Sequence, residues 1–425
     1  MFKFFLLLNV FVLLPMYPLF GQPSPAAVDA GVAGNSINSI GLDLLHTTAR
    51  PDANALLSPY SIGLALAMTY AGADGQTRDE MARVLHLPKD DAQVARAFGE
   101  LQSMMNEVVQ KSVEASAKMK QYGESNDPIT LDIANRLFGQ KDYDFRPAFL
   151  DLLKTNYHAP FQPMDFFHDA AGAAKVINDW VEQQTKGRIR DLVPAGALDR
   201  LTELVLVNAI YLKAPWAEPF QASGTKPMPF YAPGGAAEVP MMSIQKRFGY
   251  AKTNGVTVVS LPYTGRDLHL LIILPDDTNG LAKVESELTA EQLAGWATLP
   301  ARDVRLFLPK FKMEPPTLAL GEALQKLGMR TAFDKPRGSA NFDRMAPRRP
   351  NNYLYISDVF HKTFLSVDEK GTEAAAATAV AMMRASAIMR PQEPVEVKVD
   401  HPFILAIQHR ASGACLFLGQ VVNPK

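Results

Sequence analysis

The chain has 425 residues, of which 47% are hydrophobic, so it is long enough to bury a large core in one domain or a few. Its 43 lysines and arginines are almost balanced by 44 aspartates and glutamates, which gives no support for nucleic acid or an anionic membrane as the main partner. The single cysteine, Cys415, excludes an internal disulfide, and the chain has no N-glycosylation sequon.

The first 21 residues have the pattern of a signal peptide. Lys3 supplies the positive charge and Phe4 to Leu14 the apolar run, which is shorter than the roughly 20 residues that span a bilayer. We therefore predict a signal peptide over residues 1–21, cleaved after Gly21 or near Ala26, and an uncleaved anchor is the alternative. The mature protein is expected to be secreted and extracellular, or periplasmic if the source is a Gram-negative bacterium, without attachment to a membrane.

The segment that follows is rich in proline, alanine and glycine, and we predict a flexible leader over residues 22–34. A helix is expected over residues 35–48, where isoleucines and leucines recur at helical spacing. Ile62 to Ala71 is apolar on all sides, which predicts a buried helix, and Ser58 before Pro59 is a good N-cap for it. Thr77 and Glu80 have the spacing of a capping box for the next helix.

A long polar helix is predicted from Leu101 to Tyr122. Its lysines at 111, 118 and 120 alternate with glutamates at 107 and 114, a pattern typical of a solvated face. We therefore do not expect this helix to bind a glycosaminoglycan.

The middle of the chain alternates helices with apolar strands. The expected strands are 130–138, 204–212, 256–262, 268–275 and 304–312, and the expected helices are 149–156, 171–185 and 320–327. The strand over residues 204–212 is apolar throughout except for Asn208, so it should be central and covered on both faces. No repeat or linker divides residues 35–425, which we predict to be one domain.

Motifs of common enzymes are absent from the sequence. It has no G-x-S-x-G, H-E-x-x-H, phosphate-binding P-loop or G-x-G-x-x-G, and its eight histidines do not cluster at metal-ligand spacing. We therefore expect no enzyme activity, no cofactor and no metal. Four polar residues interrupt apolar stretches, and a buried hydrogen-bond network explains them better than a catalytic serine and histidine. They are Ser58, Ser61, Asn208 and His361.

One alanine-rich stretch, residues 369–383, is compatible with two structures. Its four consecutive alanines favour a helix, since alanine has the highest helix propensity. Taken in alternation, however, Thr372, Ala374, Ala376 and Thr378 would share one face of a strand. That face is small and uncharged, so such a strand could enter between two existing strands.

These motifs together resemble the serpins, the family of serine protease inhibitors. The matching patterns are the hinge-like stretch, Ser58-Pro-Tyr-Ser61, the run from Asn208 to Phe220, Val397 to Ile407, and Leu416 to Pro424. In the run from Asn208 to Phe220, Ala214-Pro215 replaces the glycine segment usual in the family, and Trp216 stays in register. The resemblance covers residues 35–425. It implies an α+β serpin fold with three β-sheets, about eight to nine helices and an exposed reactive-centre loop, in a monomer.

The resemblance also implies roles for three groups of residues. The hinge, which enters the sheet when the loop inserts, comprises Glu369, Gly371, Thr372, Glu373, Ala374, Ala375, Ala376, Ala377 and Thr378. The shutter network, behind the strands that separate, comprises Ser58, Ser61, Asn208 and His361. The breach, at the top of the sheet, comprises Trp216, Lys310 and Glu369.

The implied partner is a serine protease. It cleaves the reactive loop of the serpin and is trapped as a covalent acyl-enzyme when that loop inserts into the sheet of the serpin as a strand. Counting sixteen residues from Glu369 places the reactive bond at Ala385–Ser386 and implies an elastase-like protease. Arg384–Ala385 would imply a trypsin-like target, and Met383–Arg384 a chymotrypsin-like or neutrophil-elastase-like one. The alternative is a non-inhibitory serpin acting as carrier, chaperone or storage protein. The four alanines of the hinge argue against that class, whose hinges commonly carry bulky, charged or proline residues.

Overall fold

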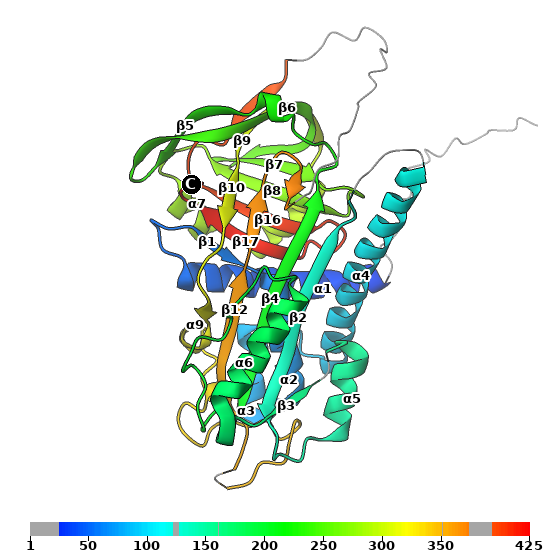
Figure 1. Cartoon of the computed structure of the whole chain (residues 1–425), viewed down its shortest axis with the longest axis vertical. Helices are drawn as coiled ribbons and strands as arrows, with labels where there is room; N and C mark the ends of the chain where they lie inside the picture. Colours follow the sequence, from blue (N-terminus) through cyan, green and yellow to red (C-terminus); the bar gives the residue numbers. More distant parts are fainter. Residues whose placement is uncertain (1–24, 122–126, 160, 351, 374–392) are drawn as a thin grey trace, which may run out of the picture.

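The computed structural model describes residues 25–121, 127–159, 161–350, 352–373 and 393–425. Figure 1 shows an elongated molecule in which the long strands β2 (Thr130–Gln140), β4 (Leu204–Pro215) and β12 (Ile356–Thr363) run side by side along the long axis. Helix α6 (Phe166–Gln184) lies over one face of these strands, and α2 (Pro59–Gly72) lies against the other. This double cover explains why β4 is an almost unbroken apolar run.

Nine α-helices are present in the described part of the chain. They are α1 (Pro25–Thr48), α2, α3 (Gly75–Val84), α4 (Asp91–Gln121), α5 (Pro147–Asn156), α6, α7 (Leu281–Glu287), α8 (Ala290–Gly295) and α9 (Gly321–Lys326). The helices expected from apolar spacing are confirmed, with shifted ends. The predicted N-cap of α2 is also confirmed, because the side chain of Ser58 accepts a hydrogen bond from the backbone N–H of Ser61.

The predicted flexible leader is wrong for residues 25–34, because these residues form the first turns of α1. Ala30 and Ala33 are fully buried there. Gly34 packs so closely that a Cβ atom in its place would lie 2.4 Å from the carbonyl oxygen of Ser412. Small residues at the start of α1 therefore permit close packing, and their composition alone resembled that of a linker.

The predicted capping box of α3 is also wrong. The N-cap is Asp74, and the hydroxyl of Thr77 instead accepts a hydrogen bond from the backbone N–H of Asn341 at 3.0 Å. The carboxylate of Glu80 accepts hydrogen bonds from the backbone N–H groups of Arg330 and Thr331 at 2.8 and 2.7 Å. Both side chains thus satisfy a distant segment of the chain, which local spacing could not reveal.

The strands form two hydrogen-bonded networks among the described residues. The larger has the order β1-β17-β16-β8-β7-β6-β9-β15, with β5 paired to β6, and the smaller has the order β10-β13-β14-β4-β12-β11, with β2 paired to β4 and β3. The strands not yet bounded are β1 (Ala55–Leu57), β3 (Gln162–Met164), β5 (Lys226–Ala232), β6 (Gly235–Thr253), β7 (Val256–Pro262), β8 (Leu268–Pro275), β9 (Ala301–Pro309), β10 (Phe311–Met313), β11 (Leu318–Ala319), β13 (Leu365–Val367), β14 (Gly371–Thr372), β15 (Val395–Lys398), β16 (Phe403–His409) and β17 (Cys415–Val421).

The long strand β6 links two parts of the larger network. Its first half pairs with β5, its middle with β9, and its last residues with β7. For this reason the three sheets implied by the resemblance are joined here as two networks. The expected strands at residues 256–262 and 268–275 are confirmed as β7 and β8, whereas the one expected at 304–312 is divided into β9 and β10 at Lys310.

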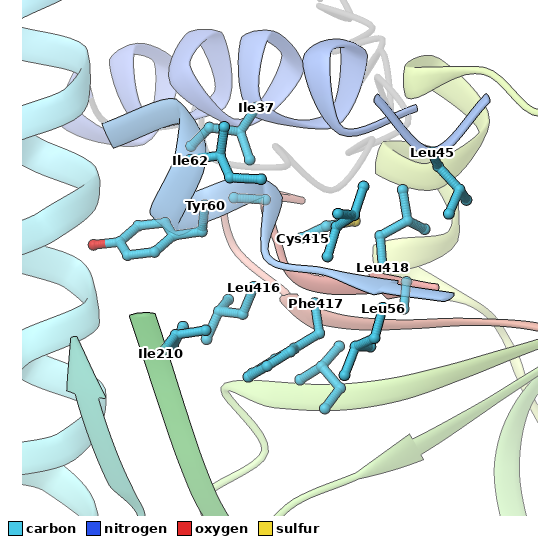
Figure 2. Close-up of a cluster of buried hydrophobic side chains, with 14 of the residues drawn as sticks. Ile37, Leu45, Leu56, Tyr60, Ile62, Ile210, Cys415, Leu416, Phe417 and Leu418 are labelled. Atoms are coloured by element: carbon cyan, nitrogen blue, oxygen red, sulfur yellow. The ribbon is translucent and has the colours of Figure 1, made fainter. Parts of the chain in front are cut away.

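The core fills the space between α1, α2 and the strands of both networks. Figure 2 shows side chains from these elements in one buried cluster, among them Ile37, Leu56, Ile62, Ile210 and Leu418. Cys415 belongs to this cluster, and burial raises the pKa of its thiol to about 12. The core therefore extends from the helical layer to the central strands that carry the candidate site.

Candidate functional site

The candidate site lies where two parallel central strands separate. β4 pairs with β12 along the length of β12, up to Thr363 opposite Ile210. Beyond that point β14 lies next to β4, and β13 pairs with the other side of β14. Gly371 and Thr372, which belong to the predicted hinge, therefore already occupy a strand position between two neighbouring strands.

Gly371 is required by close backbone contact. It pairs with Pro215 and has a φ of +153°, in the region that favours glycine. A Cβ atom in its place would lie 2.2 Å from the carbonyl oxygen of Ala214. Any other residue would push the hinge out of its place beside β4.

Thr372 is fully buried beneath an aromatic stack. Its hydroxyl lies 2.6 Å from the hydroxyl of Tyr263, and both are buried. The ring of Tyr263 stacks on the indole of Trp216, with the ring centroids 4.6 Å apart and the planes 7° from parallel. Sequence reasoning missed Tyr263, because an aromatic residue just after a strand carries no signal of such a contact.

The three predicted breach residues lie together at the base of the hinge. The ammonium of Lys310 lies 2.8 Å from one carboxylate oxygen of Glu369, and the hydroxyl of Thr225 donates to the other at 2.7 Å. The indole N–H of Trp216 donates to the carbonyl of Asp368 at 2.9 Å. Burial by itself would raise the pKa of Glu369, but the hydrogen bonds from Lys310 and Thr225 outweigh it and lower this pKa. Glu369 is therefore held as a carboxylate.

Glu373 ends the paired part of the hinge. Its φ is +46°, so the backbone leaves the extended conformation of β14 at this residue. Its N–H still donates to the carbonyl of Ser366 at 2.9 Å, and its carboxylate lies 2.5 Å from the guanidinium of Arg188. Burial raises the pKa of Glu373, and the charge of Arg188 opposes that shift. Arg188, in the connection between α6 and β4, was missed because it is far from the hinge in sequence.

The four predicted shutter residues meet where β4 and β12 are still paired. The imidazole Nε2 of His361 accepts the backbone N–H of Ser58 at 3.0 Å, and its Nδ1 contacts Oδ1 of Asn208 on the adjacent strand. The hydroxyl of Ser58 accepts the N–H of Ser61 at 3.1 Å. Asn135 of β2, which the sequence did not single out, accepts the hydroxyl of Ser61 at 2.6 Å. The network thus joins α2 to β2, β4 and β12.

The hydrogen bonds define which ring nitrogen of His361 carries the proton. Because Nε2 accepts a backbone N–H, the proton of the neutral ring is on Nδ1 and is donated to Asn208. Burial lowers the pKa of His361 to about 3, against the opposing effect of its contact with Asn208. Since the imidazole contacts the backbone of Ser58 and the hydroxyl of Ser58 binds Ser61, this is a structural network and not an arrangement of nucleophile and base.

Several predicted residues lie outside the described part of the chain. They are Ala374 to Ala377, Thr378, Met383, Arg384, Ala385 and Ser386, together with the predicted signal peptide. Within the described ranges, no group of three or more His, Cys, Asp or Glu side chains could hold a metal ion. None of the described helices is both long enough and apolar enough to cross a membrane.

Comparison with known proteins gives consistent matches over most of the chain. A family model described as "Serpin (serine protease inhibitor)" matches residues 35–424. The leukocyte elastase inhibitor of Bos taurus is 38% identical over 402 residues, covering 92% of this chain and 99% of that protein. An uncharacterized serpin-like protein of Thermococcus kodakarensis is 40% identical over 394 residues, covering 92% of this chain and 85% of that protein. The crystal structure of uncleaved ovalbumin matches with a TM-score of 0.76 and 27% identity, over 92% of this chain and 100% of the other.

Gly371 and Thr372 of the hinge thus occupy a strand position between β4 and β13, next to the point where β4 and β12 stop pairing. With the family match over residues 35–424, the chain belongs to the serpin family. The α+β fold and the family expected from the sequence are both confirmed.

Proposed function

We propose that this serpin is secreted and inhibits serine proteases as a suicide substrate. The observation that carries the proposal is the position of the hinge between two central strands. Gly371 and Thr372 lie between β4 and β13, while β4 and β12 are still paired below them. The space between β4 and β12, which the rest of the loop would enter, is therefore closed, and it begins directly at the hinge. Separating β4 from β12 would open a slot between two strands whose exposed edges both require a partner.

In the proposed mechanism the protease performs half of its ordinary reaction. Its serine attacks a carbonyl in the loop, the peptide bond breaks, and an acyl-enzyme forms with the new loop end. The freed loop then inserts between β4 and β12, moves the attached protease and distorts its active site before water can hydrolyse the ester. Ladder hydrogen bonds of about 0.5–1.5 kcal/mol each over about a dozen residues provide on the order of 10 kcal/mol for this step.

The proposed target is an elastase-like protease that cleaves Ala385–Ser386. The support is the count from Glu369, the small side chain of Ala385, and the name of the bovine relative, a leukocyte elastase inhibitor. Cleavage at Arg384–Ala385 by a trypsin-like enzyme is the alternative, followed by Met383–Arg384.

The first experiment incubates the purified protein separately with pancreatic elastase, trypsin and chymotrypsin. The expected result is a complex with elastase that survives a denaturing gel, and a released C-terminal peptide whose mass corresponds to a start at Ser386. A peptide starting at Ala385 would move the bond to Arg384. Rapid cleavage by all three proteases without a stable complex would contradict the mechanism and favour a non-inhibitory serpin.

Two substitutions locate the bond independently. Arg384→Ala should leave the elastase complex unchanged, because the carbonyl that the protease attacks at the proposed bond belongs to Ala385 and not to Arg384. Ala385→Arg should move inhibition from elastase to trypsin, since it places a basic side chain at the cleaved bond. Loss of trypsin inhibition in Arg384→Ala would instead assign the bond to Arg384–Ala385.

Secretion has its own test. The full-length chain, expressed in a host with a secretory pathway, should be recovered from the medium or the periplasm with an N-terminus that begins at Gln22 or near Ala26. A protein that stays in the membrane fraction with an intact N-terminus would support the uncleaved anchor.

A further inference from the structure

A cavity between α1 and α7 has the features of a small-molecule site. It lies between the C-terminal end of α1, the helix α7, the tip of β5 and the ends of β16 and β17, and its volume is about 460 Å³. Cavities of roughly 300–1,000 Å³ hold small organic ligands. Figure 1 shows α7 next to the C-terminal end of the chain and on the opposite side of the molecule from α4. None of the described residues that line the cavity belongs to the hinge, the breach or the shutter network.

Part of the cavity wall is apolar and includes an accessible aromatic ring. Tyr231, at the tip of β5, is 47% exposed, which is unusual for so large a side chain in this protein. Leu281 of α7 and Pro402, just before β16, line the same cavity and are themselves largely buried. Such a wall can accommodate the hydrocarbon or aromatic body of a ligand.

Gln420 adds a hydrogen-bond acceptor that lacks a donor. This residue of β17 is fully buried and lines the cavity. Its amide nitrogen donates to the carbonyls of Arg50 and Ala53, both at 2.7 Å, so the orientation of the amide is defined. Its Oε1 is buried, and no group in the described ranges donates to it. A buried acceptor without a donor is rare in native proteins, and a donor that entered this wall of the cavity would satisfy it.

Glu285 of α7 adds negative charge to the same wall. Burial raises the pKa of its carboxyl, and the charge of His46 opposes this shift only in part. The imidazole Nε2 of His46 lies 2.6 Å from the backbone carbonyl of Glu285, so it is committed to the main chain. Since no lysine or arginine is among the described residues that line the cavity, a cation from outside would find an unneutralised carboxylate there.

From these features we propose that the cavity binds a small organic amine, a protonated nitrogen on an apolar or aromatic body. The ammonium group supplies the N–H that Gln420 requires and the positive charge that Glu285 favours, and the body packs on Tyr231 and Leu281. An anion of the same shape would meet the carboxylate of Glu285 without compensation, and a neutral analogue would lose the charge interaction. This site is separate from protease inhibition and does not depend on the proposed function.

The test is a calorimetric titration of the full chain at pH 7.5 with three probes of similar shape, phenethylamine, phenethyl alcohol and phenylacetate. The amine should bind saturably at one site, the alcohol at least about tenfold more weakly, and the acid without measurable saturation. Equal affinity for the amine and the acid, or no saturable binding of the amine, would overturn the proposal.

Substitutions on α7 test whether binding occurs in this cavity. Glu285→Gln should weaken phenethylamine about tenfold and leave the alcohol unchanged. The matched control is Glu287→Gln on the same helix, whose side chain is exposed and does not line the cavity, and it should have no effect.

Ala282→Trp, at an exposed lining position, should fill the cavity and abolish binding. Undiminished binding in Ala282→Trp, or equal losses in both glutamate variants, would show that the amine binds elsewhere and would refute the site. Protease inhibition should be unchanged in all three variants, which separates this test from that of the proposed function.

Discussion

At the scale of single residues, Thr372 is a position where the hinge should not tolerate a charge. It is fully buried, and its hydroxyl contacts that of Tyr263. We predict that Thr372→Arg converts the inhibitor into a substrate, because a guanidinium at this position would be buried without a partner at a cost of several kcal/mol. The stoichiometry of inhibition, measured by titrating a fixed amount of protease, should rise at least about tenfold. Thr372→Ser, which keeps the hydroxyl, should behave like the unchanged protein, and a normal stoichiometry in Thr372→Arg would contradict this role.

His361 makes stability depend on pH. Its pKa is about 3 in the folded protein, compared with about 6.5 in the unfolded chain, and the pKa of the buried His269 is likewise lowered to about 4. Well above pH 6.5, as at pH 7.5, both histidines are almost entirely neutral in either state, so their full contribution is present. Between pH 6.5 and 4 only the unfolded chain takes up these protons, and the free energy of unfolding should fall by about 1.4 kcal/mol per pH unit for each histidine. Urea unfolding at pH 7.5, 6.5, 5.5 and 4.5 measures this slope, and His361→Gln should reduce it by one histidine's share. An unchanged slope in that variant would show that His361 does not contribute.

At the scale of elements, the connection between α6 and β4 is coupled to the short strand β14 through Arg188 and Glu373. Glu373 has only 13% of its side chain exposed, whereas Arg188 is 50% exposed, so solvent screens part of their attraction. In a double-mutant cycle of Arg188→Ala and Glu373→Gln, measured by urea unfolding, we expect a coupling energy of about 1 kcal/mol. Arg188→Ala alone should be the more damaging change, because it leaves a largely buried carboxylate without its cation. Strictly additive effects would show that this contact does not hold the hinge.

At the scale of the whole molecule, insertion of the loop should convert a closed sheet into one with an additional central strand. The paired strands β4 and β12 would each keep a full set of ladder partners, and the loop would gain on the order of 10 kcal/mol of hydrogen bonding. After cleavage of the loop by a non-target protease, the midpoint of thermal unfolding should therefore rise by roughly 15–20 °C, since each kcal/mol is worth about 2 °C or somewhat less in a large domain. Cleaved Thr372→Arg is the control and should show little gain. An unchanged midpoint in the cleaved native sequence would exclude insertion.

Much of the site could be expected from the sequence because its residues are exceptions to local rules. Asn208 and His361 stand out as polar residues in apolar strands, and a buried polar group needs partners. Gly371 was assigned to the hinge by the resemblance alone, and the structure supplies its physical reason, because a Cβ atom in its place would lie 2.2 Å from the carbonyl oxygen of Ala214. By contrast, Asn135, Tyr263 and Arg188 occur in contexts that are ordinary for their residue types. Only the pairing of β2 with β4, the turn after β7 and the return of the chain after α6 bring them to the site.

The sequence by itself indicated the family and the α+β class through its resemblance to the serpins. It also determined the apolar central strands and the uncharged alternating face of the hinge, because periodicity and residue size are local properties of the chain. The tertiary structure alone decided that α1 begins within the alanine-rich and glycine-rich leader, that Thr77 and Glu80 satisfy a distant segment, and that Lys310 interrupts a strand next to Glu369. It also decided how far the hinge has entered the sheet, with Thr372 paired and Glu373 turned away. These features depend on which distant backbone and charged groups are brought within hydrogen-bond distance, and that is settled only when the whole core packs.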